Sequence, residues 1–424
     1  MPDPFRSMAA LILAQGWDKA LMTAALNAVL ERPAQARQTV DQAMRAWTQP
    51  YPPGERALAA ILEAGWFGDR PDMPPISAPA APHRPGVFAG AGLPEIDGID
   101  GLATWLDLPV GQLLWLADCD GRLARDLSRQ GHYNQIFLKK RKGLRLVEAP
   151  LPRLKAVQRQ ILNSLLDKVP AHADATGFVR GRDCRTGAAR HSGQAVVIRL
   201  DLAEFFPSIP SARIHAIFRT LGYPDQVARL LTGLTTTRTP ADAVLALAPQ
   251  QRAHHRAPHL PQGAPTSPAL ANLAARRLDV RLAGLARRID ARYSRYADDI
   301  TFSGDTGIAF DGGAPILEVI AEIVADCGFR LNPAKTRIQR SGGRQMVTGI
   351  VVNSHLNVPR DAYDRLKATV HNCLRHGPDA QNRAGHPDFR AHLEGRIAWI
   401  AALNPRRAAK LYAVFDRIDW HRGE

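Results

Sequence analysis

The stretch Arg295-Tyr296-Ala297-Asp298-Asp299-Ile300-Thr301-Phe302-Ser303 sets two adjacent aspartates between aromatic and β-branched residues. The pattern predicts a β-hairpin over residues 292–303, with both acids at its tip. Burying neighbouring carboxylates costs free energy unless a cation neutralises them. An Asp-Asp pair alone is usually only a polar turn, so a metal site needs a further acid nearby.

That acid follows a second apolar run. Residues 194–200 are almost continuously apolar or β-branched, which is typical of a buried strand, and Asp201 comes next. Mg²⁺ prefers hard oxygen ligands from one or two carboxylates together with substrate phosphates. Two strands that each end in Asp therefore predict a two-metal site, where one ion activates a primer hydroxyl and the other holds a triphosphate. Phosphoryl transfer needs such carboxylates and basic residues, but no covalent nucleophile.

Composition agrees with a polyanionic partner. The 424 residues are 45% hydrophobic, enough for a sizeable core, and 55 Lys and Arg against 40 Asp and Glu give a net charge of +15. The four cysteines have no spacing typical of a zinc clamp or a disulfide framework. With neither a signal peptide nor a membrane span in the sequence, we expect a cytoplasmic protein without a membrane partner.

The pattern along the chain suggests four parts. Residues 1–70 are Ala- and Leu-rich, and apolar residues at helical spacing (Leu13, Trp17, Leu21, Ala24 and Ala28) predict a helical domain. Residues 71–94 contain seven prolines and read as a linker. Further on we expect helices over 96–127, 155–168, 269–285 and 316–327, a basic hairpin with strands 135–139 and 144–148, a strand over 345–353, and C-terminal helices over 362–374, 387–403 and 406–417.

Four blocks now resemble reverse transcriptases, in the order usual for that family. Residues 198–209 look like the first catalytic block, and Tyr296-Ala297-Asp298-Asp299 like the signature hairpin. Leu260-Pro261-Gln262-Gly263-Ala264-Pro265-Thr266-Ser267-Pro268 resembles the block between them, and residues 328–336 the block after the hairpin. The resemblance covers roughly residues 93–419. It implies an α+β right-hand polymerase with fingers and palm over 95–353, a helical thumb over 354–424 and an additional N-terminal all-α domain.

The resemblance also implies roles for single residues. Two Mg²⁺ ions would be bound by Asp201, the Leu202 carbonyl, Asp298 and Asp299, and the three aspartates would be catalytic. The nucleotide contacts it implies are Arg145, Lys140, Phe206, Gln262, Gly263 and Lys335. Three alternatives stay open: Lys139 in place of Lys140, a core role for Phe206 with Phe205 facing the sugar, and a simple phosphate contact by Lys335 in place of proton donation to pyrophosphate.

A shorter motif, Val347-Thr348-Gly349, resembles the triplet that retron enzymes carry for recognising their RNA. Its alternative is an ordinary strand with a glycine bulge. His191 lies in a segment similar to the retron insertion block, although Gly187 stands where Asn is usual, and a structural histidine is the alternative. These four residues, Val347, Thr348, Gly349 and His191, are the expected RNA contacts.

The sequence thus predicts an RNA-directed DNA polymerase that copies a cognate structured non-coding RNA, used as primer and template, into single-stranded DNA like that of retrons. Its partners would be deoxynucleoside triphosphates and an RNA–DNA duplex. The resemblance implies a setting in anti-phage defence and leaves room for an accessory effector protein. The alternatives are another defence-associated reverse transcriptase without a retron RNA, and a catalytically idle RNA-binding protein with the polymerase fold.

Overall fold

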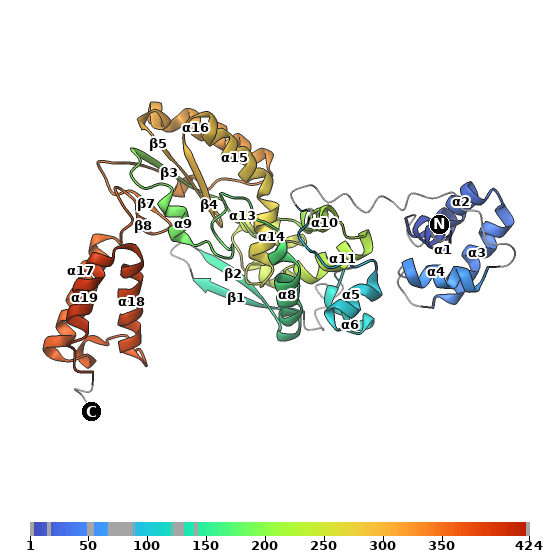
Figure 1. The fold of residues 1–424 in the computed structure, drawn as a ribbon, viewed down its shortest axis with the longest axis horizontal. Coiled ribbons are helices and arrows are strands. Elements are labelled where there is room, and N and C mark those ends of the chain that lie inside the picture. The colour runs from blue at the N-terminus through green and yellow to red at the C-terminus, as the bar shows by residue number, and fades with distance from the viewer. Residues whose placement is uncertain are drawn as a thin grey trace. The chain divides into compact units, whose positions relative to one another are not determined.

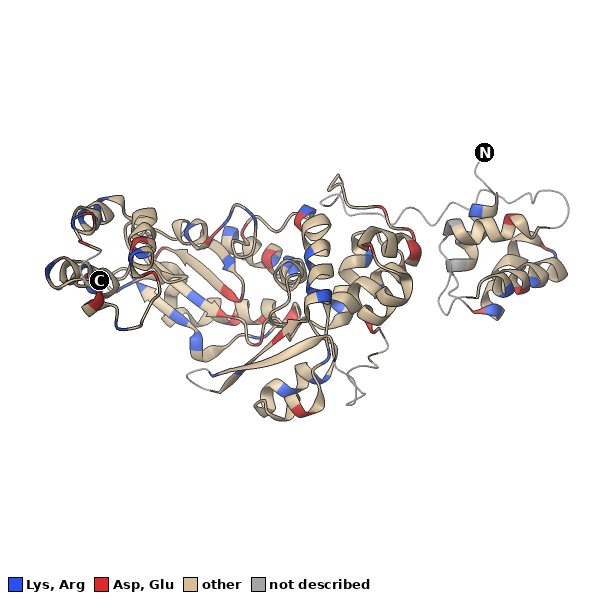
Figure 2. Cartoon of the chain, turned by 90° about the horizontal axis from the view of Figure 1, so that it is seen from below, with Lys and Arg blue, Asp and Glu red and all other residues tan. Residues whose placement is uncertain are grey.

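The computed structural model describes residues 4–14, 18–48, 55–66, 88, 90–119, 121, 131–139 and 143–420. The chain divides into two compact units, neither of them continuous in sequence: the first contains residues 1–170 and 206–274, and the second residues 171–205 and 275–424. Lys and Arg are distributed over both units and do not gather in one tail (Figure 2). Within the described residues, no helix has both the length and the apolar character needed to cross a membrane.

The N-terminal part of the first unit is helical. Helices α1 (Pro4–Ala14), α2 (Lys19–Leu30), α3 (Pro33–Ala46) and α4 (Glu55–Ala64) share a hydrophobic core of their own. The expected apolar stripe is wrong in α2, where Leu21, Ala24 and Ala28 are exposed, whereas Met22 and Leu26 are buried; Trp17 lies outside the described residues. The reason is local: the side chain of Asp18 accepts a hydrogen bond from the Leu21 amide and starts a new helix, which resets the helical phase.

The rest of the first unit surrounds a two-stranded hairpin. Strands β1 (Tyr133–Lys139) and β2 (Leu144–Pro150) pair antiparallel. The expected helix over 96–127 is interrupted at Pro109 and gives α5 (Ile99–Leu106) and α6 (Val110–Ala117); residues 122–127 lie outside the described part. The remaining helices are α8 (Pro152–Ser164), α10 (Ser211–Thr220), α11 (Asp225–Thr235), α12 (Ala241–Leu245), α13 (Pro249–Arg256) and α14 (Ser267–Ala274).

The second unit is built on a four-stranded antiparallel sheet in the order β4-β5-β3-β6. Its strands are β3 (Val196–Asp201), β4 (Arg292–Tyr296), β5 (Asp299–Gly304) and β6 (Arg337–Arg340). Helix α15 (Arg276–Arg288) packs on β4, and α16 (Ala314–Asp326) packs on α15 (Figure 1). Because β3 is a central strand, Val196, Val197 and Ile198 are fully buried, as their apolar character predicts.

The C-terminal part of this unit is a helical bundle joined to a small hairpin. Helices α17 (Arg360–His376), α18 (Phe389–Leu403) and α19 (Pro405–Phe415) share one core with Val347 and Ile350 of strands β7 (Met346–Val347) and β8 (Ile350–Val351). The strand expected over 345–353 is therefore a hairpin. The bundle and the hairpin are packed together.

Candidate active site

The register of the central strands brings two of the predicted acids together. Asp201 of β3 is the direct partner of Asp299 of β5 in the antiparallel ladder. Directly opposed residues in such a ladder have neighbouring Cβ atoms on the same face. Asp201 is only 5% exposed. Asp298 precedes Asp299 in the β4–β5 turn and its carbonyl accepts a hydrogen bond of 2.9 Å from the Leu202 amide. All three acids thus meet at one end of the sheet.

A buried ion pair supports the β4–β5 turn that carries the acids. Arg295 and Asp279 of α15 are both fully buried, and two guanidinium nitrogens donate to the two Asp279 oxygens at 2.7 Å. A third nitrogen of Arg295 donates to the Ala297 carbonyl at 2.9 Å, and Ala297 has a φ of +56°. Left-handed backbone is strained for alanine. The hydrogen bond from Arg295 therefore fixes an unusual conformation next to Asp298.

A lysine and an asparagine complete the surroundings of Asp201. The Lys335 ammonium donates to Asp201 Oδ2 at 2.6 Å, and the Asn332 side chain donates to Oδ1 at 3.3 Å. The Asn332 amide also donates to the Asp201 main-chain carbonyl at 2.8 Å. The Lys335 side chain is 57% exposed, so its ammonium can reach both solvent and carboxylate. Asn332 was not among the predicted site residues, although it stands in the block that matched the family.

The electrostatics of this cluster suit a divalent cation. The pKa of Asp299 is raised because its carboxyl is partly removed from water; Arg199 opposes this effect, while the charges of Asp298 and Asp201 add to it. Crowded carboxylates that repel one another are stabilised by a hard cation, and their oxygens are the ligands that Mg²⁺ prefers. The donor set therefore fits the expected metal ions.

Apart from Phe206, the predicted nucleotide contacts of the first unit lie on two segments. Arg145 is exposed on β2, and the exposed Lys139 ends β1; Lys140 lies outside the described residues. The Gln262 carbonyl accepts a hydrogen bond of 2.8 Å from the Glu148 amide of β2. Gly263 has a φ of +128°, and a Cβ there would come within 2.8 Å of a Val147 methyl group. The loop can approach β2 this closely only because residue 263 is glycine.

The two neighbouring phenylalanines differ in burial. Phe205 is 4% exposed, and its ring packs against Phe329 at a centroid distance of 5.6 Å. Phe206 is only partly buried. Of the two readings that the sequence left open, the one with Phe205 as the core ring is therefore favoured.

The predicted RNA contacts have contrasting surroundings. His191 is fully buried, with its two ring nitrogens 2.7 Å from the hydroxyls of Ser303 and Ser294, which favours the structural alternative. Val347 is 1% exposed and belongs to the core. Thr348 and Gly349, with φ of +48° and +86°, form the turn of the β7–β8 hairpin. Two central residues with positive φ are typical of a type I′ turn, so the glycine-bulge reading is wrong.

Comparison with known proteins agrees with this geometry. Residues 137–360, just over half of the chain, match the family described as reverse transcriptase (RNA-dependent DNA polymerase). The chain belongs to this family and is an RNA-directed DNA polymerase.

The relatives of this chain show to which group of reverse transcriptases it belongs. The retron Mx65 reverse transcriptase of Myxococcus xanthus is 41% identical over 76% of this chain and 72% of the relative. The retron Mx162 reverse transcriptase of the same organism is 35% identical over 80% of this chain and 70% of the relative. The chain is therefore a retron-type reverse transcriptase. A solved foamy viral protease-reverse transcriptase in complex with double-stranded DNA aligns at 15% identity over 69% of this chain and 47% of its own, with a TM-score of 0.31, too low to support an argument.

Proposed function

We propose that Asp201, Asp298 and Asp299 are the catalytic carboxylates and that, with the Leu202 carbonyl, they hold two Mg²⁺ ions. The observation that carries this proposal is the direct pairing of Asp201 with Asp299 across β3 and β5. When bound, the ions would activate the primer hydroxyl and offset the charge of the triphosphate. Main-chain hydrogen bonds from Asn332 to Asp201 and from Leu202 to Asp298 fix the backbone that carries these acids.

Basic and aromatic residues would position the deoxynucleotide. We assign Arg145 and Lys140 of the β1–β2 hairpin to the triphosphate, and Gln262 and Gly263 to the base and template side. Lys335 is assigned to the leaving pyrophosphate, because its exposed ammonium lies beside Asp201. The partly buried Phe206 would exclude a ribose 2′-hydroxyl by steric clash. In phosphoryl transfer such positioning supplies most of the catalysis.

The substrate we propose is a structured non-coding RNA that serves as both primer and template. Two relatives that are 41% and 35% identical to this chain are named retron reverse transcriptases. The turn at Thr348 and Gly349 is flanked by Val347 and Ile350, which share a core with the helices α17, α18 and α19, so RNA bound at the turn would be held by the packed bundle and hairpin. The product would be a single-stranded DNA joined to the RNA through a guanosine 2′-hydroxyl.

The test is to express the chain with the RNA encoded upstream of it, isolate nucleic acid, remove RNA with RNase and treat half of the sample with an enzyme that cleaves 2′,5′ linkages. We expect one discrete DNA whose mobility changes on debranching. Unbranched or heterogeneous DNA, or equal amounts without the upstream RNA, would contradict the retron substrate while leaving polymerase activity standing. Thr348→Ala should reduce use of the cognate RNA more than extension of a generic annealed primer.

We propose anti-phage defence as the biological setting, with an effector protein encoded nearby. Cells carrying the complete locus should resist phages that plate normally on cells with the Asp298→Asn variant. Equal plating efficiencies over a broad phage panel would count against this setting.

A further inference from the structure

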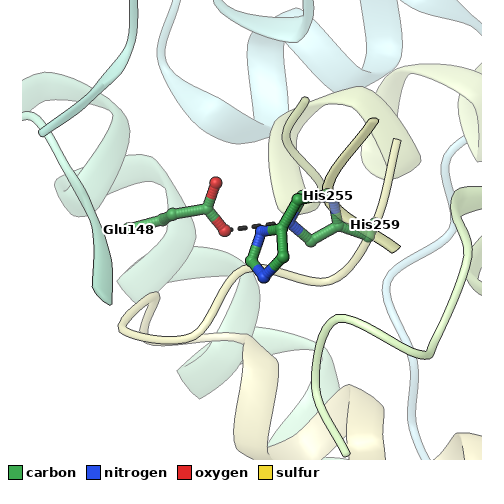
Figure 3. Close-up of side chains that lie close together, drawn as sticks. All are labelled: Glu148, His255 and His259. Carbon is green, nitrogen blue, oxygen red and sulfur yellow. Dashed lines mark hydrogen bonds and ion pairs between the residues drawn. The ribbon is translucent and has the colours of Figure 1, made fainter. Parts of the chain in front are cut away.

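The first unit contains a cluster of four buried polar side chains, three of them titratable, to which the proposed reaction gives no role. Glu148 of β2, Thr239, His255 of α13 and His259 are between 1% and 4% exposed, and the carboxylate and the two imidazoles lie close together (Figure 3). The Thr239 hydroxyl donates to Glu148 Oε1 at 2.6 Å and lies 3.0 Å from His255 Nδ1. His259 Nε2 lies 2.9 Å from Glu148 Oε2.

The hydrogen bonds determine where the protons are. His259 Nδ1 lies 2.8 Å from the Ala257 carbonyl, which can only accept, so Nδ1 carries a hydrogen. Nε2 faces a carboxylate oxygen, and a second proton must therefore lie between His259 and Glu148. The single hydroxyl hydrogen of Thr239 goes to Glu148, so the Thr239 oxygen accepts from His255. Every contact in the cluster is then a complete hydrogen bond, and the Glu148–His259 pair is neutral as a whole.

The electrostatics agree with an ionised carboxylate. Burial raises the pKa of Glu148, but the hydrogen bond and charge of His259, the hydrogen bond of Thr239 and the charge of His255 together lower it below its ordinary value.

The cluster lies where three segments of the first unit meet. The Glu148 amide donates to the Gln262 carbonyl, so β2 and the loop of Gln262 and Gly263 are joined by main chain and side chain. His259 also exchanges two main-chain hydrogen bonds with Thr237, at 2.8 and 2.9 Å. The strand that carries Arg145 is thereby held against the loop that carries Gln262.

We propose that Glu148 and His259 are a positioning pair for the incoming nucleotide: they hold the triphosphate-binding strand at a fixed place relative to the Gln262–Gly263 loop. The inference rests on the nucleotide contacts proposed above. A zinc ion bound by Glu148, His255 and His259 is the competing explanation for the cluster. Ligand atoms about 2.1 Å from a tetrahedral zinc lie about 3.4 Å from one another, whereas His259 Nε2 and Glu148 Oε2 are at hydrogen-bond distance, 2.9 Å.

Two substitutions of Glu148 distinguish a role for its hydrogen bonds from a role for the volume of its side chain alone. In Glu148→Gln, the amide oxygen accepts from Thr239 and the amide nitrogen donates to a neutral His259, so each bond is replaced. In Glu148→Ala both bonds are lost. Tyr133→Phe is the matched control, because it removes a different buried hydrogen bond, the 2.8 Å bond from Gln158, on the partner strand of the same hairpin.

The measurement is KM for deoxynucleotide against kcat on a generic annealed primer and template, corrected for the fraction of active enzyme. For Glu148→Ala we expect KM to rise about tenfold or more with a change in kcat of at most about threefold, because nucleotide binding is affected and the acids are not. Glu148→Gln should restore KM to within about threefold of wild type. Tyr133→Phe should lower Tm and leave KM unchanged. An unchanged KM in Glu148→Ala overturns the inference, while extension by the wild type leaves the proposed function intact.

Hydrogen exchange gives a readout that does not depend on activity. Glu148→Ala should speed amide exchange in both residues 144–150 and residues 258–263, and Glu148→Gln should not. If the wild type extends no primer, the proposed function fails and this comparison alone decides whether the pair joins the two segments. Metal analysis of the purified protein should find no zinc in stoichiometric amount. One zinc per chain that is lost in Glu148→Gln would replace the proton-bearing pair by a metal site.

Discussion

Asp201 and Asp299 face each other as direct partners on two antiparallel strands, although 97 residues separate them in the sequence. The alternation of the ladder allows no other arrangement, because a slip of one residue would turn one carboxylate to the opposite face of the sheet. The pairing that gives the sheet its register is therefore the pairing that assembles the acidic site.

Neutralising one acid should separate catalysis from binding. Asp201→Asn or Asp298→Asn should reduce DNA synthesis at least about 1,000-fold in a primer-extension assay, because a metal ligand is removed, whereas RNA affinity should change less than about threefold, because it comes from many Lys and Arg contacts. Asp326→Asn is the control, since Asp326 forms a surface ion pair with Arg281. A variant of Asp201 or Asp298 that extends primers at nearly the wild-type rate would refute the assignment.

Sugar selectivity should depend on Phe206 and not on Phe205. Phe206→Ala should raise ribonucleotide incorporation relative to deoxyribonucleotide about tenfold or more in single-nucleotide extension, because the ring expected to exclude the 2′-hydroxyl is gone. Phe205→Leu should lower stability by roughly 1–2 kcal/mol through lost packing on Phe329 and leave the ratio unchanged. The reverse result would exchange the roles of the two rings.

Substitutions in the buried Arg295–Asp279 pair should change the free energy of unfolding and kcat independently of each other. Arg295→Met should cost about 3–5 kcal/mol in urea unfolding, because it leaves Asp279 charged and unpaired in the core. Adding Asp279→Asn should recover most of that stability, while kcat stays at least about tenfold low, because the Ala297 carbonyl still lacks its donor. Tyr293→Phe removes only the hydroxyl bond to Asp279 and should cost about 1 kcal/mol without lowering kcat. Full recovery of kcat in the double variant would show that Arg295 does not position the turn.

Stability at acid pH should depend on His191. Burial, and then the charges of Arg190 and Arg292, lower the pKa of His191 to about 3, against 6.5 for the exposed group. Between these values the unfolded chain binds the extra proton, so the stability from neutral His191 is complete above pH 6.5 and is lost as pH falls towards 3. Between pH 6 and 5 the wild type should lose up to about 1.4 kcal/mol more than His191→Gln in urea unfolding. Parallel pH curves would contradict the buried neutral state, and reduced use of the cognate RNA by His191→Gln at pH 8 would restore an RNA role.

The sequence predicts the fold best where the local residue pattern agrees with the environment of the segment in the folded chain. The apolar run before Asp201 and the alternation around Asp298 gave strands within a residue or two of β3, β4 and β5. The pattern around Thr348 predicts a strand and not a turn, because threonine rarely adopts positive φ. The expected helix over 269–285 is two helices that meet at Ala275, a residue with no helix-breaking character.

The supports of the site could not be predicted, because they are pairs distant in sequence. Glu148 and His259 are 111 positions apart, and Arg295 and Asp279 are 16 apart on different elements. Each partner alone is an ordinary charged residue, and only the fold shows that both are fully buried. His191 illustrates the same limit in the other direction, since its place in a family block suggested RNA while the two serines that hold it lie more than 100 residues later.

The order of strands in the sequence has a consequence for biosynthesis. Strand β3 is made first, and both of its neighbours, β5 and β6, lie about a hundred residues or more further on. A ribosome adding about 5–20 residues per second needs roughly 5–20 s to reach β5. During that interval an apolar strand with two unpaired edges exists beside its acid, and the nascent chain has no assembled active site. A chain that ends before Asp299 therefore lacks both of the strands that pair with β3.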